Sequence, residues 1–218
     1  MNQLVRTSDG SHTLYVPELN EHYHSIHGAI LQSELVYIKN GLTFCKKNPL
    51  NIFEVGFGTG LNALLSAIST FDNKQTVHYT SIEKYPLSKS VIKALNHWRF
   101  AGKEGKQIFD SIHNSKWGSF RKINEYFYLK KIKCDLITDN FKGKYDLIYF
   151  DAFGPNKQPE IWTERVFKKI SEIIVPGGIF VTYSAKGEVK RLLRTKGFKV
   201  GVLPGPPGKR EMIRAIKL

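Results

Sequence analysis

Segments typical of strands and segments typical of helices alternate along most of this 218-residue chain. Short runs rich in aliphatic and aromatic residues are followed by stretches with helical spacing of apolar residues. Strands separated by helices pair in parallel, and the helices cover both faces of the sheet. The predicted strands are 51–55, 78–82, 134–138, 145–150, 179–183, 198–203 and 211–217, and the predicted helices are 61–69, 87–98, 161–173 and 188–195.

The last two predicted strands are joined by residues 204–208, Pro-Gly-Pro-Pro-Gly, which are too few for a crossover helix but suit a hairpin. The final strand is therefore expected to be antiparallel. A seven-stranded, mostly parallel sheet with an antiparallel last strand and helices on both faces indicates an α/β fold of the Rossmann-like class I S-adenosylmethionine (SAM) methyltransferase type. Dinucleotide dehydrogenases, in contrast, normally finish with parallel strands.

The length and the absence of repeats or low-complexity tracts predict a single domain, residues 1–218. Two segments exceed the minimal layout. Residues 1–50 are expected to form an N-terminal extension that packs on the domain, and residues 84–133 an enlarged insertion between the second and third strands. Additions of this kind often build a wall of the substrate site.

A glycine-rich turn, Glu54–Gly60, follows the first of these predicted strands. Gly56, Gly58 and Gly60 allow a tight turn and the close approach of a ligand to bare backbone. The helix that begins at Leu61 then directs free amide groups toward the ligand. A dinucleotide-binding turn would place its third glycine where Leu61 stands, so a nicotinamide oxidoreductase ranks last among the alternatives.

Two acidic residues are predicted at the carboxyl ends of the next strands. Glu83 ends the second strand, where a carboxylate can accept hydrogen bonds from both ribose hydroxyls of a bound adenosine. Asp139 is predicted at the end of the third strand, where it would receive the adenine amino group. A lone acid at a strand end is more often simply solvated, but the order and spacing of these groups after the glycine turn favour a SAM site.

The predicted strand 145–150 leads into Asp151, and open α/β sheets bind their ligands at the carboxyl ends of strands. For methyl transfer to an amine, Asp151 would accept the N–H or the departing proton. The alternative is that Asp151 caps the following turn or helix. In the rim that follows, Phe153 and Trp162 are candidates for stacking on an incoming base and Lys157 supplies a cation.

The net charge is +14 and the pI about 9.7, and such an excess of positive charge attracts polyanions. The range from Lys116 to Lys144 contains eight Lys or Arg and three acidic residues, and the range from Lys186 to Leu218 contains ten and two. A basic balance can also serve solubility alone. Its concentration in two segments favours a nucleic-acid partner.

The N-terminus carries no apolar leader, and no apolar run reaches the ~18 residues of a membrane span, so a cytoplasmic protein without a membrane partner is expected. Cys45 and Cys134 are too few for a disulfide framework or a zinc site. His22, His24 and His27 lie close together, but no carboxylate or cysteine completes a ligand set. We therefore expect no metal.

Together these motifs resemble the methyltransferase domain of the MnmC family, which modifies the wobble uridine of certain transfer RNAs. The similarity spans about residues 23–212. The segments that carry it are 54–62 (EVGFGTGLN), 81–87 (SIEKYPL), 151–162 (DAFGPNKQPEIW), 176–178 (PGG) and 209–212 (KREM).

The resemblance implies that SAM methylates the primary amine of 5-aminomethyl-2-thiouridine in transfer RNA, giving the 5-methylaminomethyl form. The cofactor would contact Glu54, Gly56, Gly58, Gly60, Asn62, Glu83, Lys84, Asp139 and Asp151. The reacting amine would lie beside the catalytic set Asp151, Phe153 and Pro155. The substrate and its RNA would contact Tyr23, Gln32, Lys157, Trp162, Lys186, Lys209 and Arg210.

Many members of that family carry a second, flavin-dependent domain that trims a carboxymethylaminomethyl precursor, and this chain ends at Leu218 without it. A stand-alone methyltransferase is therefore expected, and either a separate oxidase supplies the aminomethyl precursor or the substrate differs slightly. Two alternatives remain. One is a spermidine-synthase-like aminopropyltransferase, which the basic charge disfavours because polyamines are cations. The other is an RNA-binding module that has kept the fold and lost the chemistry.

Overall fold

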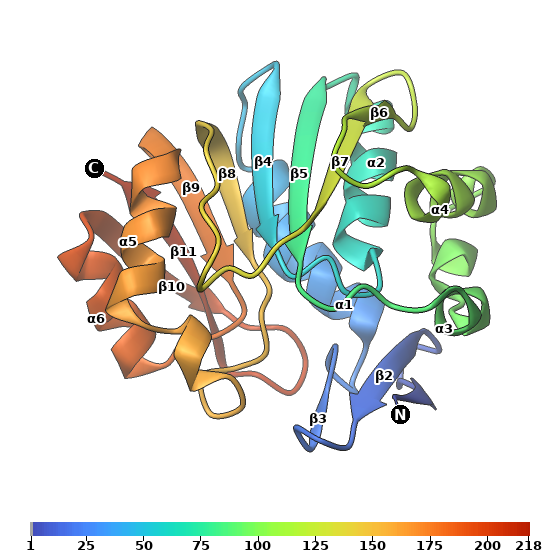
Figure 1. Cartoon of the computed structure of the whole chain (residues 1–218), viewed down its shortest axis with the longest axis horizontal. Helices are drawn as coiled ribbons and strands as arrows, with labels where there is room; N and C mark the ends of the chain where they lie inside the picture. The colour runs from blue at the N-terminus through green and yellow to red at the C-terminus, as the bar shows by residue number, and fades with distance from the viewer. Residues whose placement is uncertain (1) are drawn as a thin grey trace.

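The computed structural model describes residues 2–218 and contains two sheets, a large one at the centre and a small one beneath it (Figure 1). The large sheet has the strand order β10-β11-β9-β8-β4-β5-β7-β6. Its strands are β4 (Leu50–Val55), β5 (Val77–Glu83), β6 (Arg121–Lys122), β7 (Phe127–Lys133), β8 (Tyr145–Phe150), β9 (Ile174–Thr182), β10 (Phe198–Pro204) and β11 (Glu211–Lys217).

The five inner strands β7, β5, β4, β8 and β9 are parallel, whereas β11 is antiparallel to both β9 and β10. This arrangement confirms the predicted α/β fold with a mostly parallel sheet and an antiparallel C-terminal hairpin. The sheet has eight strands instead of the seven predicted, because the two-residue strand β6 pairs with the outer side of β7. The last strand along the chain, β11, lies inside the sheet, between β9 and β10.

The prediction for the third strand was wrong. Residues 134–138 form a loop, and the strand is β7, directly before them. Phe127, Leu129 and Lys131 are the buried positions of β7. The Lys131 ammonium donates hydrogen bonds to the carbonyl oxygens of Ile112 (2.7 Å) and His113 (3.1 Å) at the end of a neighbouring helix. Because this inward position holds a cation, the alternation of apolar residues in β7 is not visible in the sequence. The connection between the second and third parallel strands, β5 and β7, is therefore residues 84–126 and not 84–133.

Helices cover both faces of the large sheet (Figure 1). Successive strand residues alternate between the faces, so that Ile52 belongs to one apolar cluster and Phe53 to the other. The predicted helix 87–98 is broken at Leu95, where the backbone is extended. The helices are α1 (Ala29–Ser33), the π-helix η1 (Glu34–Leu42), α2 (Leu61–Asn73), α3 (Lys89–Ala94), the 3-10 helix η2 (His97–Phe100), α4 (Gly105–Asn114), the 3-10 helix η3 (Pro159–Ile161), α5 (Glu164–Ile173) and α6 (Gly187–Thr195).

The N-terminal segment forms the small antiparallel sheet, with the strand order β1 (Gln3–Arg6), β2 (His12–Val16) and β3 (Glu21–His22). It lies below the large sheet in Figure 1, next to the carboxyl ends of the parallel strands. Leu14 of β2 is 1% exposed and joins the main apolar cluster. This segment therefore packs on the edge of the sheet where ligands of α/β proteins bind.

Candidate functional site

A cavity of about 830 Å³ opens at the carboxyl ends of β4, β5 and β8. Its walls come from the small N-terminal sheet, the glycine-rich turn after β4, the start of α3, the loop after β7 and the segment after β8. The volume is within the range of about 300–1,000 Å³ that small-molecule sites occupy.

The glycine-rich turn presents bare backbone to this cavity. Gly56, Gly58 and Gly60 have φ angles of 90°, 50° and 73°, which residues with side chains rarely adopt. A Cβ at Gly58 would lie 3.2 Å from the ring of Tyr23, and a Cβ at Gly56 would lie 2.8 Å from the carbonyl oxygen of Asp151. Gly56 and Gly58 line the cavity, whereas Gly60 lies outside the cavity wall. Gly60 is the N-cap residue of α2 and offers no side-chain cap. The first amide groups of α2 therefore remain available to a ligand.

Asn62, on the first turn of α2, joins two carboxylates. Its amide nitrogen donates to Glu54 Oε1 (3.0 Å) and to Asp151 Oδ2 (2.7 Å). Glu54 lies beneath the cavity and also accepts from the Ser81 hydroxyl (2.5 Å). The side-chain oxygen of Asn62 is buried and has no partner among the described residues, although Asn62 lines the cavity. An unsatisfied acceptor in a cavity wall fits a ligand that brings hydrogen-bond donors.

Burial raises the pKa of Glu54 to about 8, more than the hydrogen bonds from Ser81 and Asn62 lower it. The folded protein thus holds a proton that the unfolded chain releases above about pH 4.5. The stability that this proton contributes is complete below pH 4.5 and is lost as the pH rises through about 8.

Glu54→Gln is expected to remove this dependence. As the pH rises from 5 to 8.5, the melting temperature of the ligand-free variant, relative to that of the wild type, should increase by on the order of 5 °C. Calorimetric melting across this range measures the effect. The exposed Glu172→Gln is the matched control and should follow the wild type. A constant difference between Glu54→Gln and the wild type at all pH values would show that Glu54 is ionised throughout.

Asp151 follows β8 and lines the cavity, as its place at a strand end predicts. The Tyr37 hydroxyl donates to Asp151 Oδ1 (2.6 Å), and Asn62 holds the other oxygen. Burial raises the pKa of Asp151 to about 6, against the opposing effects of these two hydrogen bonds and of the Lys209 charge. The carboxylate is therefore fixed in position, and each oxygen keeps a second lone pair for the cavity.

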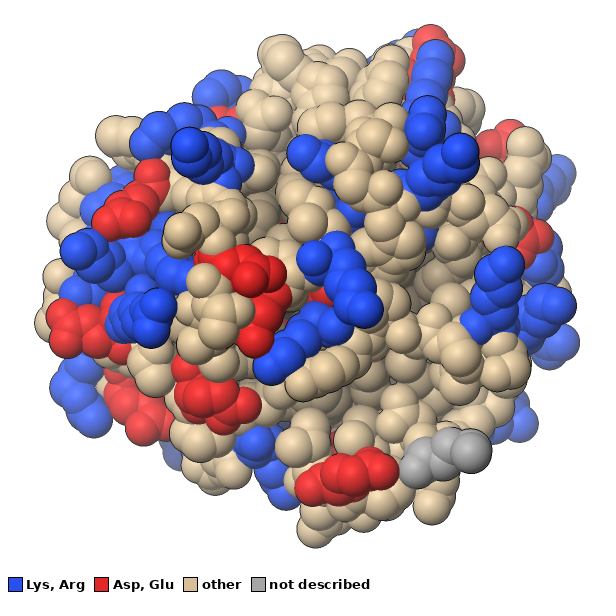
Figure 2. All heavy atoms as spheres, viewed as in Figure 1, with Lys and Arg blue, Asp and Glu red and all other residues tan. Residues whose placement is uncertain are grey.

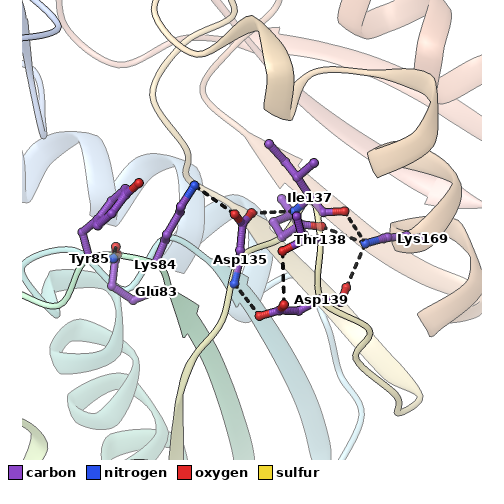
Figure 3. Close-up of polar contacts among 9 residues, drawn as sticks. Glu83, Lys84, Tyr85, Asp135, Ile137, Thr138, Asp139 and Lys169 are labelled. Atoms are coloured by element: carbon purple, nitrogen blue, oxygen red, sulfur yellow. Dashed lines mark hydrogen bonds and ion pairs between the residues drawn. The ribbon is translucent and has the colours of Figure 1, made fainter.

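Glu83, at the end of β5, also lines the cavity. Its carboxylate accepts from the Gly58 amide (3.0 Å) and the Tyr85 amide (2.8 Å). The next residue, Lys84, lines the cavity and forms an ion pair with Asp135 (2.9 Å) across the ends of β5 and β7 (Figure 3). Two acidic residues, Glu83 and Asp135, thus face the same end of the cavity.

The acid that lines the cavity after β7 is Asp135 and not Asp139, which the sequence pattern favoured. Asp139 lies six residues beyond the end of β7, and its carboxylate accepts from the Asp135 amide (2.9 Å) and the Thr138 hydroxyl (3.1 Å). Lys169 of α5 donates to the Asp139 and Ile137 carbonyls, both at 2.8 Å (Figure 3). Asp139 therefore helps to shape the loop that presents Asp135.

The aromatic rim differs in part from the prediction. Phe153 lines the cavity and makes an edge contact with Tyr23, their ring centroids 5.1 Å apart. Trp162 cannot stack on a base, because its indole is 6% exposed and packs against Phe150, and its N–H donates to the Phe153 carbonyl (2.8 Å). Pro155 is buried and is not part of the cavity wall.

The remaining residues predicted to meet the substrate lie outside the cavity wall. Gln32 is buried, and its side-chain oxygen accepts from the Ser25 amide (2.9 Å). Lys157 and Lys186 lie on or beside the segment after β8, bonded to the Asn20 carbonyl and the Asn156 side chain. In the loop between β10 and β11, the Lys209 ammonium lies 4.7 Å from the Tyr183 ring centroid, and Arg210 is exposed.

Sequence reasoning missed Tyr37, which reaches Asp151 from the π-helix η1. π-helical turns are rare and often occur at functional sites. No local pattern in the segment 34–42 indicates this contact, because its partner is 114 positions away.

Residues 2–218 contain neither a metal-binding cluster nor a membrane-spanning helix. They contain no cluster of three or more His, Cys, Asp or Glu side chains placed to hold a metal ion. Within the same residues, no helix combines the length and the apolar character needed to cross a membrane.

Comparisons with known proteins agree with this geometry. A family model for S-adenosyl-L-methionine-dependent methyltransferases matches residues 117–218. The tRNA 5-methylaminomethyl-2-thiouridine biosynthesis bifunctional protein MnmC of Campylobacter hominis is 31% identical over 177 residues, which are 78% of this chain and 26% of that protein. This chain therefore spans about a quarter of the length of that relative.

Among solved structures, MNMC2 from Aquifex aeolicus superposes with a TM-score of 0.82 and 28% identity, covering 99% of this chain and 70% of that one. A spermidine synthase in complex with the transition-state analogue AdoDATO superposes with a TM-score of 0.53 at 13% identity, covering 100% and 72% of the two chains. The latter likeness extends to the fold alone.

The fold, the glycine turn and the match of residues 117–218 define a class: this chain is an S-adenosyl-L-methionine-dependent methyltransferase. Its cofactor is S-adenosylmethionine. Within that class it is an MnmC-like methyltransferase.

Proposed function

We propose that this enzyme methylates the primary amine of 5-aminomethyluridine, with or without a 2-thio group, at the wobble position of transfer RNA. The observation that carries the proposal is a carboxylate, Asp151, held by Tyr37 and Asn62 in the wall of the cofactor cavity beside Phe153. The name of the MnmC relative supports the nucleoside. A separate oxidase activity would supply the aminomethyl precursor.

The cofactor is proposed to bind along the carboxyl ends of β4, β5 and β7. Glu83 would accept hydrogen bonds from the ribose hydroxyls, and Asp135 would accept one from the adenine amino group. Gly56 and Gly58 allow the remainder of the molecule to approach the backbone of the turn. The unpartnered side-chain oxygen of Asn62 is suited to a donor such as the cofactor's ammonium group.

When bound, S-adenosylmethionine supplies a methyl group on a positively charged sulfur. The amine must attack as the neutral form, because its lone pair makes the new N–C bond while the electrons of the broken C–S bond stay on sulfur. The nitrogen then carries a positive charge and releases one proton. Asp151, ionised above its pKa of about 6, would accept that proton or orient the N–H before attack.

The RNA is proposed to approach over the loop after β8 and the β10–β11 loop. Lys157, Lys186, Lys209 and Arg210 offer cations to its phosphates. Phe153 and Tyr23 offer aromatic surface to the flipped uridine. The chain's net charge of +14 supports a polyanionic substrate over a cationic polyamine.

The test is to incubate the protein and S-adenosylmethionine with transfer RNA carrying 5-aminomethyluridine at the wobble position, and then to weigh the nucleosides after digestion. A gain of one methyl group on that nucleoside is expected. Cofactor binding without methylation would reject this substrate. Transfer of an aminopropyl group from decarboxylated cofactor to a polyamine would establish the aminopropyltransferase instead, and absence of all binding would favour a non-catalytic module.

Lys209→Met is expected to weaken transfer RNA binding about three- to tenfold at physiological salt, with little change in cofactor affinity. Because the Lys209 charge lowers the pKa of Asp151, its loss should also move the acid limb of the kcat profile to higher pH. Lys199→Met, an exposed lysine on the same hairpin, is the control and should leave the kcat profile in place. An unmoved acid limb in Lys209→Met would contradict the proposed proximity of Lys209 to the reacting group.

A further inference from the structure

A second cavity, of about 480 Å³, lies between the small N-terminal sheet and the α3–η2 segment. Its lining contains three cations, Arg6, Lys93 and Arg99, and one acid, Asp9. Figure 2 shows Lys and Arg side chains gathered on the lower right of the molecule, over the region of α3 and α4 in Figure 1. No residue predicted to bind the cofactor or the substrate lines this cavity.

Side-chain hydrogen bonds hold the two walls of the cavity together. The Asn96 side chain accepts from the His12 amide (2.8 Å) and donates to the Gly10 carbonyl (3.0 Å). His12 Nδ1 also lies 3.0 Å from the Ala94 carbonyl oxygen. These contacts join segments more than 80 positions apart in the sequence, so the cavity is preformed.

The charges in the cavity favour an anion. Within residues 2–218, the structure gives Arg6, Lys93 and Arg99 no side-chain hydrogen bond and no ion pair, apart from the contact of Arg99 with the Trp98 ring at 5.2 Å. Asp9 is already engaged. Its carboxylate accepts from the hydroxyls of Thr7 (2.7 Å) and Ser11 (2.5 Å) and from the Leu31 amide (3.2 Å). The three cations therefore remain available to a ligand.

An exposed aromatic ring accompanies the cations. Phe100 is 39% exposed and lines the cavity. Gly10 lies close to both this ring and Arg6, since a Cβ on Gly10 would be 3.6 Å from Arg6 Nη2 and 3.7 Å from Phe100 Cζ. A flat guanidinium beside a flat ring is the surface on which nucleobases stack. An inorganic anion would need the cations alone, whereas a nucleotide uses both.

The second cavity lies on the same face of the small sheet as the cofactor cavity. Arg6 pairs with His12, and side chains two residues apart along a strand share a face. Asn2 and Val16 line the cofactor cavity, and Arg6 and His12 line the second one. Arg6 lies four positions after Asn2, which directly precedes β1, and Val16 lies four positions after His12 in β2. Four residues of extended chain span about 13 Å. Two or three nucleotides of one RNA strand span this distance.

We propose that the second cavity binds a nucleotide of the RNA substrate outside the reactive one, with Phe100 and Arg6 stacking on its base and Arg99 and Lys93 contacting its phosphate. The inference rests on the proposed function only in taking RNA as the partner. It adds a docking point on the N-terminal sheet, on the side of the cofactor cavity away from the β10–β11 loop.

The experiment measures binding of unmodified transfer RNA to the full chain, which requires no methylation. The test variants are Arg6→Gln/Arg99→Gln and Phe100→Leu. Their controls are Lys103→Gln, an exposed lysine in the same segment outside the cavity, and Phe71→Leu, a ring with a similar exposed fraction (42%) on α2. Uridine monophosphate is titrated as a second probe, and cofactor affinity is measured for every variant to check the fold.

The double variant is expected to lose about tenfold in RNA affinity, and its salt slope should fall by about 0.7 for each lost phosphate contact. Phe100→Leu should lose affinity with an unchanged salt slope, because stacking releases no counterions. RNA affinities equal to those of the controls would overturn the proposal. The proposal would also be overturned if the variants abolished binding of uridine monophosphate but left the RNA affinity intact. That result would indicate a site for free nucleotides. Failure of the methylation assay would leave these binding results unaffected.

Discussion

Replacing Asp151 with asparagine is expected to lower kcat by about two to four orders of magnitude and to change cofactor affinity little. The amide cannot take a proton from the amine. In addition, the two Asp151 oxygens both accept, one from the Tyr37 hydroxyl and one from the Asn62 amide, so the NH₂ group of an asparagine would face a donor on one side. Single-turnover methylation measures the chemical step, and calorimetry measures cofactor binding.

The pH profile separates this role from a structural one. In the wild type, kcat should rise as the pH increases through about 6, where Asp151 ionises. This rise of kcat near pH 6, the acid limb of the profile, should be absent in Asp151→Asn. Tyr37→Phe removes one donor to the carboxylate, and because that hydrogen bond lowers the pKa of Asp151, the limb should move to higher pH. A kcat within about threefold of wild type in Asp151→Asn would reject the role in proton transfer.

Gly58→Val is expected to weaken cofactor binding by more than about a hundredfold. The φ angle of 50° disfavours any side chain, and a Cβ would lie 3.2 Å from the ring of Tyr23, in the space where the ligand meets the backbone. The Gly58 amide also orients Glu83 through a 3.0 Å hydrogen bond. Equilibrium binding of S-adenosylmethionine, followed by calorimetry, measures the loss.

The control for Gly58→Val is Gly177→Val. Gly177 has a φ of 75°, but apart from its two chain neighbours no atom of residues 2–218 lies within 4 Å of its added Cβ, and it lies in β9, outside the cavity wall. It therefore carries similar backbone strain without obstructing the ligand. Equal losses of cofactor affinity in both variants would attribute the effect to general destabilisation and not to the turn.

The sequence was sufficient to place most strands along the chain, because their residues are apolar and bounded by turns. The end of β8 and the whole of β11 were placed correctly. Strand β7 was missed because Lys131 occupies one of its inward positions. Burial lowers the pKa of Lys131 to about 8, which shows how unfavourable this position is for a charge. A lysine at an inward strand position departs from the usual alternation of apolar and polar residues. A pattern of apolar residues cannot indicate a cation that is stabilised by the carbonyl groups of a distant helix.

The candidate site was predictable where a functional residue lies at the end of a strand or in the turn that follows it. Gly58, Glu83 and Asp151 meet that condition, and all three line the cavity. Tyr37 was missed because it lies in a π-helix that is far from its partner Asp151 in the sequence. Asp135 was overlooked in favour of Asp139 because the misplaced strand put the wrong acid at its end. Errors of this kind follow from tertiary contacts, which residue spacing does not encode.

The position of β11 between β9 and β10 has a consequence for synthesis on the ribosome. Because β9 pairs with β11 and not with β10, a nascent chain released only as far as residue 210 leaves that side of β9 without its partner. An exposed strand edge of this kind can pair with other chains. The sheet can therefore close only after residues 211–217 have emerged from the exit tunnel, and folding must be completed largely after translation of the domain.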